Sequence, residues 1–434
     1  MISWQMLLSA ILLIVVLTLV VTRPRGLNAA WPAGVAAVLT IVLGLLSLPI
    51  LRTIFDTTWD AAATLIALFL LSEALDSNGF FAWAALHLAR FARGSGWRLY
   101  LLILLLTLGV TAFLANDGAV LMLTPIFAKM LKQVYRQEHV RLPFIFAAGF
   151  FADAMSAIFV PSNLTNIIVA DANRLSFVEL ALWMFLPTLA AFVVGSLAFA
   201  LRFRREINTL YDVETLEVPA SKVGNRAVFW LGWLALGLLI VGYIIGSKFH
   251  LPVSFIACPI AVAMVIVVHI GRTRSAGLLL ASAPWPILIY ALGMFVVISA
   301  AFNAQVLNFL TIPLHGLVAA NAGSLAAIEA GGLLALLSAS VNNLPASLIG
   351  VLVLHSVHPV NLMAIYAIIL GVDIGPKLTP FGSLATLLWL GILQRNEIRI
   401  SWGTYLRENW WVALLVQGAA FLGLLASNAI LAPR

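Results

Sequence analysis

Two stretches of this sequence carry polar and charged side chains at the same spacing within apolar surroundings. Asp153 is followed ten residues later by Asn163, and Asp373 is followed ten residues later by Ser383. A further polar residue stands three positions beyond Asn163 and beyond Ser383. Carboxyl groups in such surroundings can take up and release protons, and amides and hydroxyls both donate and accept hydrogen bonds. The two stretches therefore suit a proton carrier and a binding site for a small hydrogen-bonding solute.

Four ionisable side chains lie deep within apolar segments and are the candidates for proton coupling. They are Asp117, Asp153, Asp373 and Lys377. Asp373 and Lys377 are four residues apart, so on one helix they would share a face and form a pair. Asp117 stands beside Gly118, where the start of a helix would stabilise its anion. The alternatives are a purely structural ion pair for the first two residues and a helix cap for Asp117.

A second set of candidates is neutral and would contact the solute. It comprises Asn116, Ser162, Asn163, Thr165, Asn166, Asn342, Asn343, Thr379, Ser383 and Thr386. Such a lining suits an uncharged polyhydroxyl solute, or an oxyanion held at helix N-termini. For some of these residues the alternative is a hydrogen bond between helices. The single cysteine, Cys258, excludes a multi-cysteine metal site, and we predict neither a metal site nor a cofactor.

The composition indicates the class of protein that positions these residues. Apolar residues make up 63% of the 434, and charged residues only 9%. Uncharged runs such as 227–247 are long enough to cross a hydrocarbon core of about 30 Å. The net charge of +7 then marks cytoplasmic loops rather than a nucleic-acid partner. We interpret the first apolar run, 2–21, as a retained helix because Thr-Arg-Pro-Arg follows it.

Ten crossing segments are predicted, and two apolar stretches remain. The crossings are roughly 4–21, 28–50, 60–76, 142–171, 177–201, 226–246, 252–270, 284–303, 359–393 and 408–431. The stretches 99–131 and 321–357 are interrupted by polar residues and are predicted to be re-entrant hairpins with buried tips. With the N-terminus outside, nineteen Lys and Arg residues fall inside and four outside: Arg52, Arg174, Lys248 and Arg434.

The matched spacing predicts two inverted repeats, each with five crossings. The first, 1–201, holds the hairpin 99–131 and the broken helix 142–171. The second, 226–434, holds the hairpin 321–357 and the broken helix 359–393, and a cytoplasmic linker at 202–225 joins the two. Pro161, Pro376 and Pro380 each remove a backbone donor and break a helix near the midplane. Inverted repeats with discontinuous helices are typical of secondary transporters.

Several longer motifs point to one family. The most specific is Gly-Val-Asp-Ile-Gly-Pro-Lys-Leu-Thr-Pro-Phe-Gly-Ser-Leu-Ala-Thr-Leu-Leu-Trp at 371–389. It is joined by Ala-Asn-Asp-Gly-Ala at 115–119, Ala-Gly-Phe-Phe-Ala-Asp at 148–153 and Asn-Asn at 342–343. With these motifs the chain resembles the ArsB-type arsenite and antimonite efflux permeases of the ion transporter superfamily.

The resemblance implies a secondary transporter, and not an enzyme, in the bacterial cytoplasmic (inner) membrane. It implies arsenite and antimonite efflux in exchange for protons, arsenical resistance and an elevator-type motion within the lipid. It further implies that some members act with a soluble arsenite-stimulated ATPase. The residues agree on one point. Arsenite is mostly a neutral trihydroxide, which one cysteine cannot capture by three thiolates, so hydrogen bonds must hold it. The alternatives on the same fold are a sodium/proton antiporter and a dicarboxylate or anion transporter.

Overall fold

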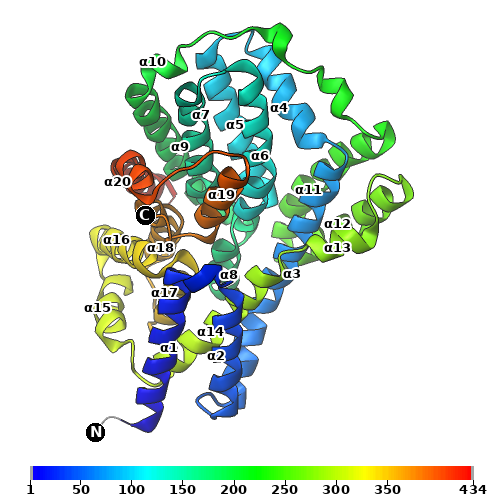
Figure 1. Ribbon diagram of the computed structural model, residues 1–434. Coiled ribbons are helices and arrows are strands. Elements are labelled where there is room, and N and C mark those ends of the chain that lie inside the picture. The colour runs from blue at the N-terminus through cyan, green and yellow to red at the C-terminus, as the bar shows by residue number, and fades with distance from the viewer. Residues whose placement is uncertain (1–2, 432–434) are drawn as a thin grey trace.

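The computed structural model describes residues 3–431, which form helices and no strand (Figure 1). Within that range nine helical segments are long and apolar enough to cross a membrane. They are α1 (Trp4–Thr22), α3 (Leu48–Ser77), α5 (Gly96–Leu114), α7 (Glu138–Ala154) with the turn after it, α9 (Phe177–Arg202), α11 (Arg226–Lys248), α13 and α14 (Ala276–Ser282 and Trp285–Asn303), α16 (Gly323–Val341) and α20 (Trp402–Leu431). The predicted all-α polytopic class is confirmed. Arg434, one of the charges predicted outside, lies beyond the described residues.

The remaining helices are shorter or more polar. They are α2 (Ala30–Val42), α4 (Phe80–Phe91), α6 (Asn116–Val134), α8 (Leu164–Ala172), α10 (Arg204–Ile207), α12 (Ser254–Ile270), α15 (Asn308–Val318), α17 (Asn343–Ser356), α18 (Leu362–Ile374) and α19 (Leu384–Arg395). The helices α4, α13 and α15 have no counterpart among the predicted segments. A search for apolar runs of about 20 residues overlooks helices of this length.

The predicted bounds of the segment 28–50 are wrong. Helix α2 ends at Val42, the chain turns at Gly44 with a φ of +62°, and α3 begins at Leu48. A positive φ favours glycine, which explains the position of the turn. Helix α3 therefore starts well before the predicted segment 60–76. It carries Arg52 and Asp56 on its exposed surface, between the two predicted segments.

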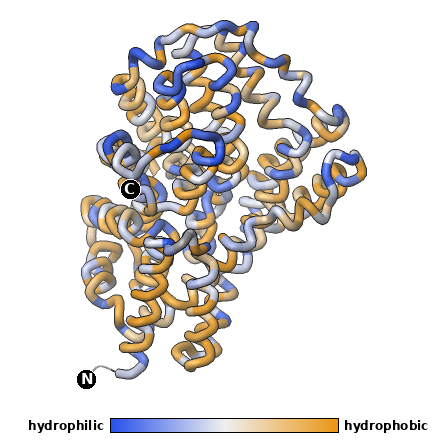
Figure 2. The backbone as a smooth tube through the Cα atoms, in the orientation of Figure 1, coloured by the Kyte–Doolittle hydropathy of each residue, from blue (hydrophilic) through white to orange (hydrophobic). Residues whose placement is uncertain are grey.

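Exposed apolar side chains mark the surfaces that face lipid. On α9 the exposed residues Leu182, Phe185, Leu189 and Val193 recur every three or four positions, which places them on one face of the helix. Other residues of α9, such as Leu180, are buried. Figure 2 shows that hydrophobic residues dominate most helices and that hydrophilic ones concentrate in the connections. An apolar exterior of this kind is the expected surface of a protein solvated by a bilayer.

Two pairs of helices reverse direction at the predicted polar tips. Helices α5 and α6 meet at Ala115, whose φ is 64°, and α16 and α17 meet at Asn342, whose φ is 92°. The tip residues Asn116 and Asn343 are buried. The helix breaks also fall where they were predicted. The 3-10 turns η2 (Ser156–Ile158) and η3 (Val160–Ser162) separate α7 from α8, and η6 (Gly375–Leu378) follows α18.

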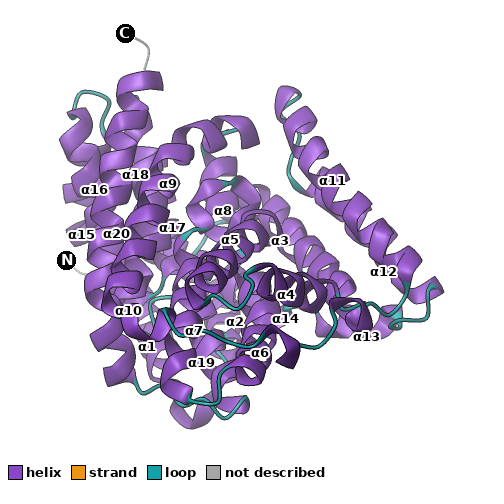
Figure 3. Ribbon diagram, turned by 90° about the horizontal axis from the view of Figure 1, so that it is seen from above, coloured by secondary structure: helices purple, strands orange, loops and turns teal. Residues whose placement is uncertain are grey.

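Helices from the two halves of the chain pack against one another. Helix α2 packs on α14, α3 on α12, α6 on α19, α8 on α17 and α9 on α20. The view in Figure 3 places α11 and α12 on the opposite side of the molecule from α16 and α20. Glycines allow the closest approaches: a Cβ on Gly371 of α18 would collide with the Gly331 carbonyl of α16. Small residues at helix contacts are typical of membrane interiors.

The connection 202–225 runs across one end of the molecule and is held by hydrogen bonds (Figure 1). It contains α10 and the 3-10 turns η4 (Val213–Thr215) and η5 (Pro219–Lys222). Arg90 of α4 donates to the Leu216 carbonyl at 2.7 Å, and Tyr135 donates to the Thr209 carbonyl at 2.9 Å. The predicted linker is therefore a strap fixed to α4 and to the end of α6.

Candidate functional site

Four helix N-termini converge on one small cavity, which we call the tip cavity. Its lining includes the first residues of α6, α8, α17 and α19 together with two residues of α14. The lining residues are Asn116, Asp117, Asn163, Leu164, Thr165, Ile287, Tyr290, Asn343, Leu344, Ser383, Leu384 and Ala385. Its volume is about 20 Å³, which is room for roughly one water molecule. Unpaired backbone N–H groups at helix N-termini favour oxygen atoms and negative charge.

Side-chain caps explain why three of these helices start at this cavity. Asn163 accepts from the Thr165 amide at 3.3 Å, Ser383 from the Ala385 amide at 3.1 Å, and Asn342 from the Leu344 amide at 3.4 Å. Asn and Ser are strongly preferred at this position because they satisfy a free backbone donor. The matched spacing seen in the sequence is thus the spacing from each buried acid to a helix cap.

The carboxyl of Asp153 is bound by residues from two elements, η6 and α6. Lys377 Nζ lies 2.6 Å from Asp153 Oδ2, and Asn116 Nδ2 donates to Asp153 Oδ1 at 2.7 Å. Lys377 Nζ also donates to Thr386 Oγ1 at 2.8 Å. The predicted pair of Asp373 with Lys377 is wrong. Helix α18 ends at Ile374, so Lys377 lies in the break rather than one helical turn beyond Asp373, and its ammonium reaches the other half of the chain.

Neutral donors bind Asp373, and they come from the first break. Asn163 Nδ2 and Thr165 Oγ1 donate to Asp373 Oδ1, each at 2.9 Å. Ser156 Oγ lies 3.2 Å from Asp373 Oδ2 and 2.6 Å from the Asp153 carbonyl. Ser156 is not among the predicted site residues, although a hydroxyl three residues after a buried acid was a signal for it. The first half of the chain therefore supplies these partners of Asp373, and the second half supplies the cation that pairs with Asp153.

Asp117 differs from the other two acids. It lines the tip cavity and is 8% exposed. Within residues 3–431 its carboxyl takes part in no hydrogen bond or ion pair that fixes it, whereas Asp153 and Asp373 are fixed. Of the four candidates for proton coupling, it is the one whose carboxyl faces the cavity.

The ten neutral candidates divide into two groups. Asn116, Asn163, Thr165, Asn343 and Ser383 line the tip cavity. The others are Ser162, Asn166, Asn342, Thr379 and Thr386. They tie the breaks to neighbouring helices, as in the bonds from Ser162 to the Ala112 carbonyl at 2.9 Å and from Thr379 to the Ala339 carbonyl at 2.6 Å. Bonds of this kind replace the backbone bonds that a broken helix lacks.

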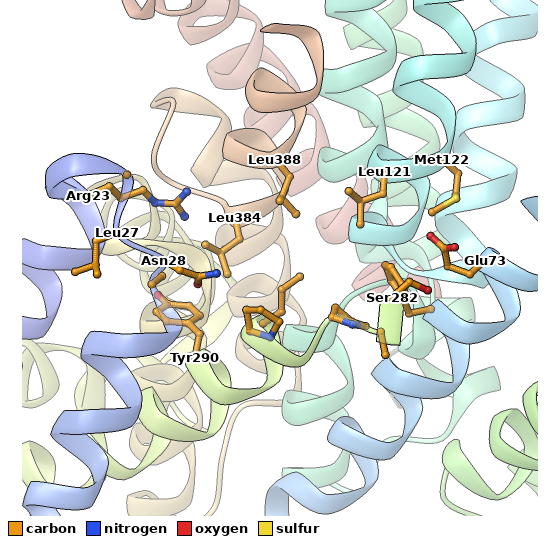
Figure 4. Close-up of a pocket in the computed structure, with 17 residues that line it drawn as sticks. Arg23, Leu27, Asn28, Glu73, Leu121, Met122, Ser282, Tyr290, Leu384 and Leu388 are labelled. Atoms are coloured by element: carbon orange, nitrogen blue, oxygen red, sulfur yellow. The ribbon is translucent and has the colours of Figure 1, made fainter. Parts of the chain in front are cut away.

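A larger cavity, which we call the vestibule, adjoins the tip cavity. Its volume is about 530 Å³, and it shares Ile287, Tyr290 and Leu384 with the tip cavity. Figure 4 shows Arg23 and Glu73 at opposite ends of the vestibule, with Tyr290 beneath Arg23. Tyr290 is fully buried, and its hydroxyl has no hydrogen-bond partner in the described part of the chain. Tyr290 is not among the predicted site residues, because an aromatic residue in an apolar helix carries no distinctive pattern.

Metal-binding clusters are absent from residues 3–431, where no three His, Cys, Asp or Glu side chains gather closely enough to hold an ion. Cys258 lies in α12, half-buried, with its Sγ 3.8 Å from the Ala63 carbonyl. It does not line the tip cavity or the vestibule.

The helical fold, the buried helix breaks and the polar cavity define a polytopic membrane transporter. A solved structure, the YdaH transporter of Alcanivorax borkumensis, is similar with a TM-score of 0.51 and 16% sequence identity, covering 90% of this chain and 91% of that one. This likeness concerns the fold alone.

The family follows from sequence comparison. The model of the ArsB family, described as arsenical pump membrane protein, matches residues 8–425. An arsenical pump membrane protein of Yersinia enterocolitica is 40% identical over 93% of this chain and 94% of its own length. One of Escherichia coli is 39% identical over the same shares. The chain belongs to the ArsB family of membrane transporters, and it is a multi-pass membrane protein rather than an enzyme.

Proposed function

We propose that this chain exports arsenite and antimonite from the cytoplasm in exchange for protons. The observation that carries the proposal is the tip cavity, where four helix N-termini and neutral side chains surround one carboxyl, Asp117. Family membership supports the choice of cargo, since the relatives are described as arsenical pumps.

The chemistry of the cargo fits this lining. Arsenite and antimonite at neutral pH are mostly uncharged trihydroxides, with three O–H donors and oxygen atoms that accept. Backbone amides at the helix starts and the amides of Asn116 and Asn343 can donate to the cargo oxygens. The Asp117 carboxylate can accept from a cargo hydroxyl. No thiolate is required, and Cys258 lies elsewhere. The tip cavity holds only about one water molecule, which is too little room for the cargo. The cargo therefore binds once α14, which carries Ile287 and Tyr290, has moved away from the helix tips.

Competition at Asp117 would couple cargo to protons. A protonated carboxyl loses the negative charge that attracts a cargo hydroxyl, so proton binding and cargo binding oppose each other. If the transporter changes between its two conformations only when either a proton or the cargo is bound, it exchanges one for the other. Asp153, Asp373 and Lys377 complete the charge network: a proton on Asp153 would leave Lys377 without its partner at 2.6 Å.

The motion that we propose is an elevator of the hairpins and broken helices against a scaffold, built from inverted repeats at 1–201 and 226–434. The exchanged packing supports this: α6 packs on α19 as α17 packs on α8, and α2 packs on α14 as α12 packs on α3. Re-entrant hairpins would place both tips at the midplane. The vestibule would face the cytoplasm, because Arg23 and the basic loops lie at that end in the predicted orientation.

The test uses everted vesicles that contain the purified protein. The solution outside such vesicles, the bath, corresponds to the cytoplasm. Radiolabelled arsenite should accumulate when the lumen is acid, and uptake should vanish when the pH gradient is collapsed. Asp117→Asn should abolish gradient-driven uptake. Asp56→Asn, which changes an exposed carboxylate on α3, is the matched control and should transport normally.

Other outcomes would redirect the proposal. Uptake that follows a sodium gradient and ignores the pH gradient would favour a sodium-coupled transporter. Uptake that requires ATP and a soluble subunit would favour a pump driven by a partner ATPase. No uptake by tight vesicles, with either gradient, would refute arsenite export by the chain alone.

A further inference from the structure

A third cavity, which we call the outer pocket, lies towards the other end of α3 from the vestibule. Its volume is about 520 Å³, and its walls come from α3, the end of α8, the beginning of α9, the end of α11 and the beginning of α12. Among the described residues, none that lines it also lines the tip cavity or the vestibule. Arg174, one of the basic residues predicted to lie outside, is part of the wall, so in the predicted orientation the pocket faces the outside.

Two buried polar atoms on this wall have no hydrogen-bond partner within residues 3–431. They are the hydroxyl of Tyr243, a side chain of α11 that is 2% exposed, and Oδ2 of Asp171 in the last turn of α8. A buried polar group without a partner is costly, so such groups in proteins are mostly bonded to protein, to water or to a ligand. The two atoms therefore mark the outer pocket as a place that can hold a hydrogen-bonding molecule.

Asp60, a further acid on this wall, is by contrast fully occupied. It accepts from the Val253 amide at 3.2 Å and from the Ser254 amide at 2.9 Å, and the Ser254 hydroxyl is a further donor to it. These bonds cap the N-terminus of α12, where the helix dipole also stabilises negative charge. Asp60 thus fixes the shape of the pocket and leaves the binding of a ligand to other groups.

The remaining charged groups on the wall do not favour one sign. Asp56 is exposed and lies 4.0 Å from Arg52 on the same helix. One acid and one base are left, Asp171 and Arg174, and neither forms an ion pair in the described part of the chain. Because charged ligands are selected by an excess of the opposite charge, this wall suits a neutral ligand.

Aromatic rings contribute to the rest of the wall. Phe177 and Tyr243 pack with their ring centroids 5.3 Å apart, and Trp59 lines the pocket from α3. An apolar wall with a few polar groups is typical of sites for small molecules. The proposed cargo, a neutral trihydroxide, matches it. A cargo hydroxyl can bond to the Asp171 carboxyl, and a cargo oxygen can accept from the Tyr243 hydroxyl. The volume leaves room for water beside the cargo.

Helix α8 connects the tip cavity with the outer pocket. Its first residues, Leu164 and Thr165, line the tip cavity, and its residues Ala170 and Asp171 line the outer pocket. Thr165 and Asp171 are six residues apart, which is about 9 Å along a helix. Cargo that leaves the helix tips towards the outside therefore reaches the outer pocket within a short distance.

We propose that the outer pocket is an exit site, where the Tyr243 hydroxyl and the Asp171 carboxyl bind arsenite or antimonite before release to the outside. The site replaces hydrogen bonds that the cargo loses on leaving the helix tips. This inference deepens the proposed arsenite export and rests on it. It also predicts an asymmetry: substitutions in the pocket change the affinity for cargo measured from the outside and leave the affinity measured from the cytoplasm unchanged.

Everted vesicles loaded with radiolabelled arsenite measure the outer affinity, because their lumen corresponds to the outside. Exchange with unlabelled arsenite in the bath is followed while the lumenal concentration is varied. Tyr243→Phe, which removes only the hydroxyl, should raise the half-saturating lumenal concentration about fivefold. Asp171→Ala should raise it by a similar factor, and Asp171→Asn, which still forms hydrogen bonds, should recover most of the loss. The half-saturating bath concentration should stay within about twofold of the parent in all three variants.

Tyr135→Phe is the matched control for Tyr243→Phe. It removes a hydroxyl of the same kind at the end of α6, where that hydroxyl donates to the Thr209 carbonyl at 2.9 Å. Both half-saturating concentrations should stay within about twofold of the parent. For Tyr243→Phe, equal shifts on the two sides of the membrane, or no shift on the lumenal side, would overturn the exit site.

Equilibrium dialysis of the purified protein separates this inference from the proposed function. Asp117→Asn weakens binding at the tip cavity, so radiolabelled arsenite bound by this variant reports on the outer pocket. Adding Tyr243→Phe should weaken that binding about fivefold. Binding that does not weaken, or no binding by Asp117→Asn, would overturn the exit site even where vesicles export arsenite.

Two further outcomes are decisive. Binding that depends on Tyr243, in a protein whose tight vesicles take up no arsenite, would support the outer pocket as a cargo site and refute export. Displacement of arsenite by an equal concentration of glycerol would assign the pocket to polyols in general and overturn its assignment to the cargo.

Discussion

The two helix breaks follow their buried acids at the same spacing in the sequence, but they carry different side chains: neutral donors in one and a cation in the other. The break between α7 and α8 offers hydroxyls and amides, and with these it holds Asp373 at distances of 2.9 and 3.2 Å. The break between α18 and α19 offers a cation, Lys377, which holds Asp153 at 2.6 Å. One acid is neutralised by an ion pair, and the other is only hydrogen-bonded.

This difference indicates that the two acids have different tasks. A buried ion pair depends on both partners, because removing either leaves an unpaired charge away from water. A carboxyl held by neutral donors can gain or lose a proton without stranding another charge. We therefore expect substitutions in the Asp153 pair to affect folding most, and substitutions around Asp373 to affect transport with less effect on folding.

The largest expected effect is that of Lys377→Ala. Both side chains of the pair are at most 2% exposed, so the substitution leaves Asp153 charged and unpaired, at a cost of about 3–5 kcal/mol in the free energy of unfolding. Titration of the protein with denaturant in mild detergent measures this loss of stability. The double variant Asp153→Asn with Lys377→Met removes both charges and should recover most of the stability. Unchanged stability of Lys377→Ala would contradict a buried ion pair.

Asp373→Asn should disable transport while leaving the fold in place. The asparagine oxygen can still accept from Asn163 and Thr165, so stability should change by less than about 1 kcal/mol. Proton-driven arsenite uptake should fall at least about tenfold, since the group can no longer ionise. Vesicle uptake at equal amounts of inserted protein gives the measurement. Normal coupling in this variant and in Asp153→Asn would remove both residues from the proton pathway.

Two helix caps offer a matched pair of smaller effects. Ser383→Ala removes only the cap of α19, which costs about 1 kcal/mol. Asn163→Ala removes the cap of α8 and also a donor to Asp373, so its cost should be about 2 kcal/mol. Midpoints of thermal unfolding compare the two variants directly. Equal destabilisation would mean that the bond from Asn163 to Asp373 adds nothing to the cap.

The smallest effect is expected outside both breaks. Cys258→Ser changes a half-buried side chain away from the tip cavity, and arsenite uptake should stay within about twofold of the parent. A well-folded variant without uptake would show that a thiolate takes part in transport, against the hydrogen-bonding lining proposed for the cargo.

Local signals in the sequence predicted the breaks and the tips. Pro161 and Pro376 interrupt helices by their own geometry, and Asn342 marks a turn because it tolerates a positive φ. These features depend on a few neighbouring residues, so the sequence alone revealed them. The short helices α4 and α15 were overlooked because a length criterion for crossing segments does not detect them.

Tertiary contacts could not be predicted in the same way. Lys377 was assigned to Asp373 because helical spacing favoured it, yet the end of α18 redirects its ammonium to Asp153. Ser156 and Tyr290 take their places from the folding of distant segments.

The exchange of partners between the halves has a consequence for synthesis. Thr165 precedes Asp373, the group that it binds, by 208 residues. At ribosomal rates of about 5–20 residues per second, that interval lasts roughly 10 to 40 seconds. During this time α6 and α8 lie in the membrane without α19 and α17, and Asp153 lacks its ammonium partner. The nascent first half must therefore be sheltered, by the insertion machinery or by water retained around its polar groups, until the second half arrives.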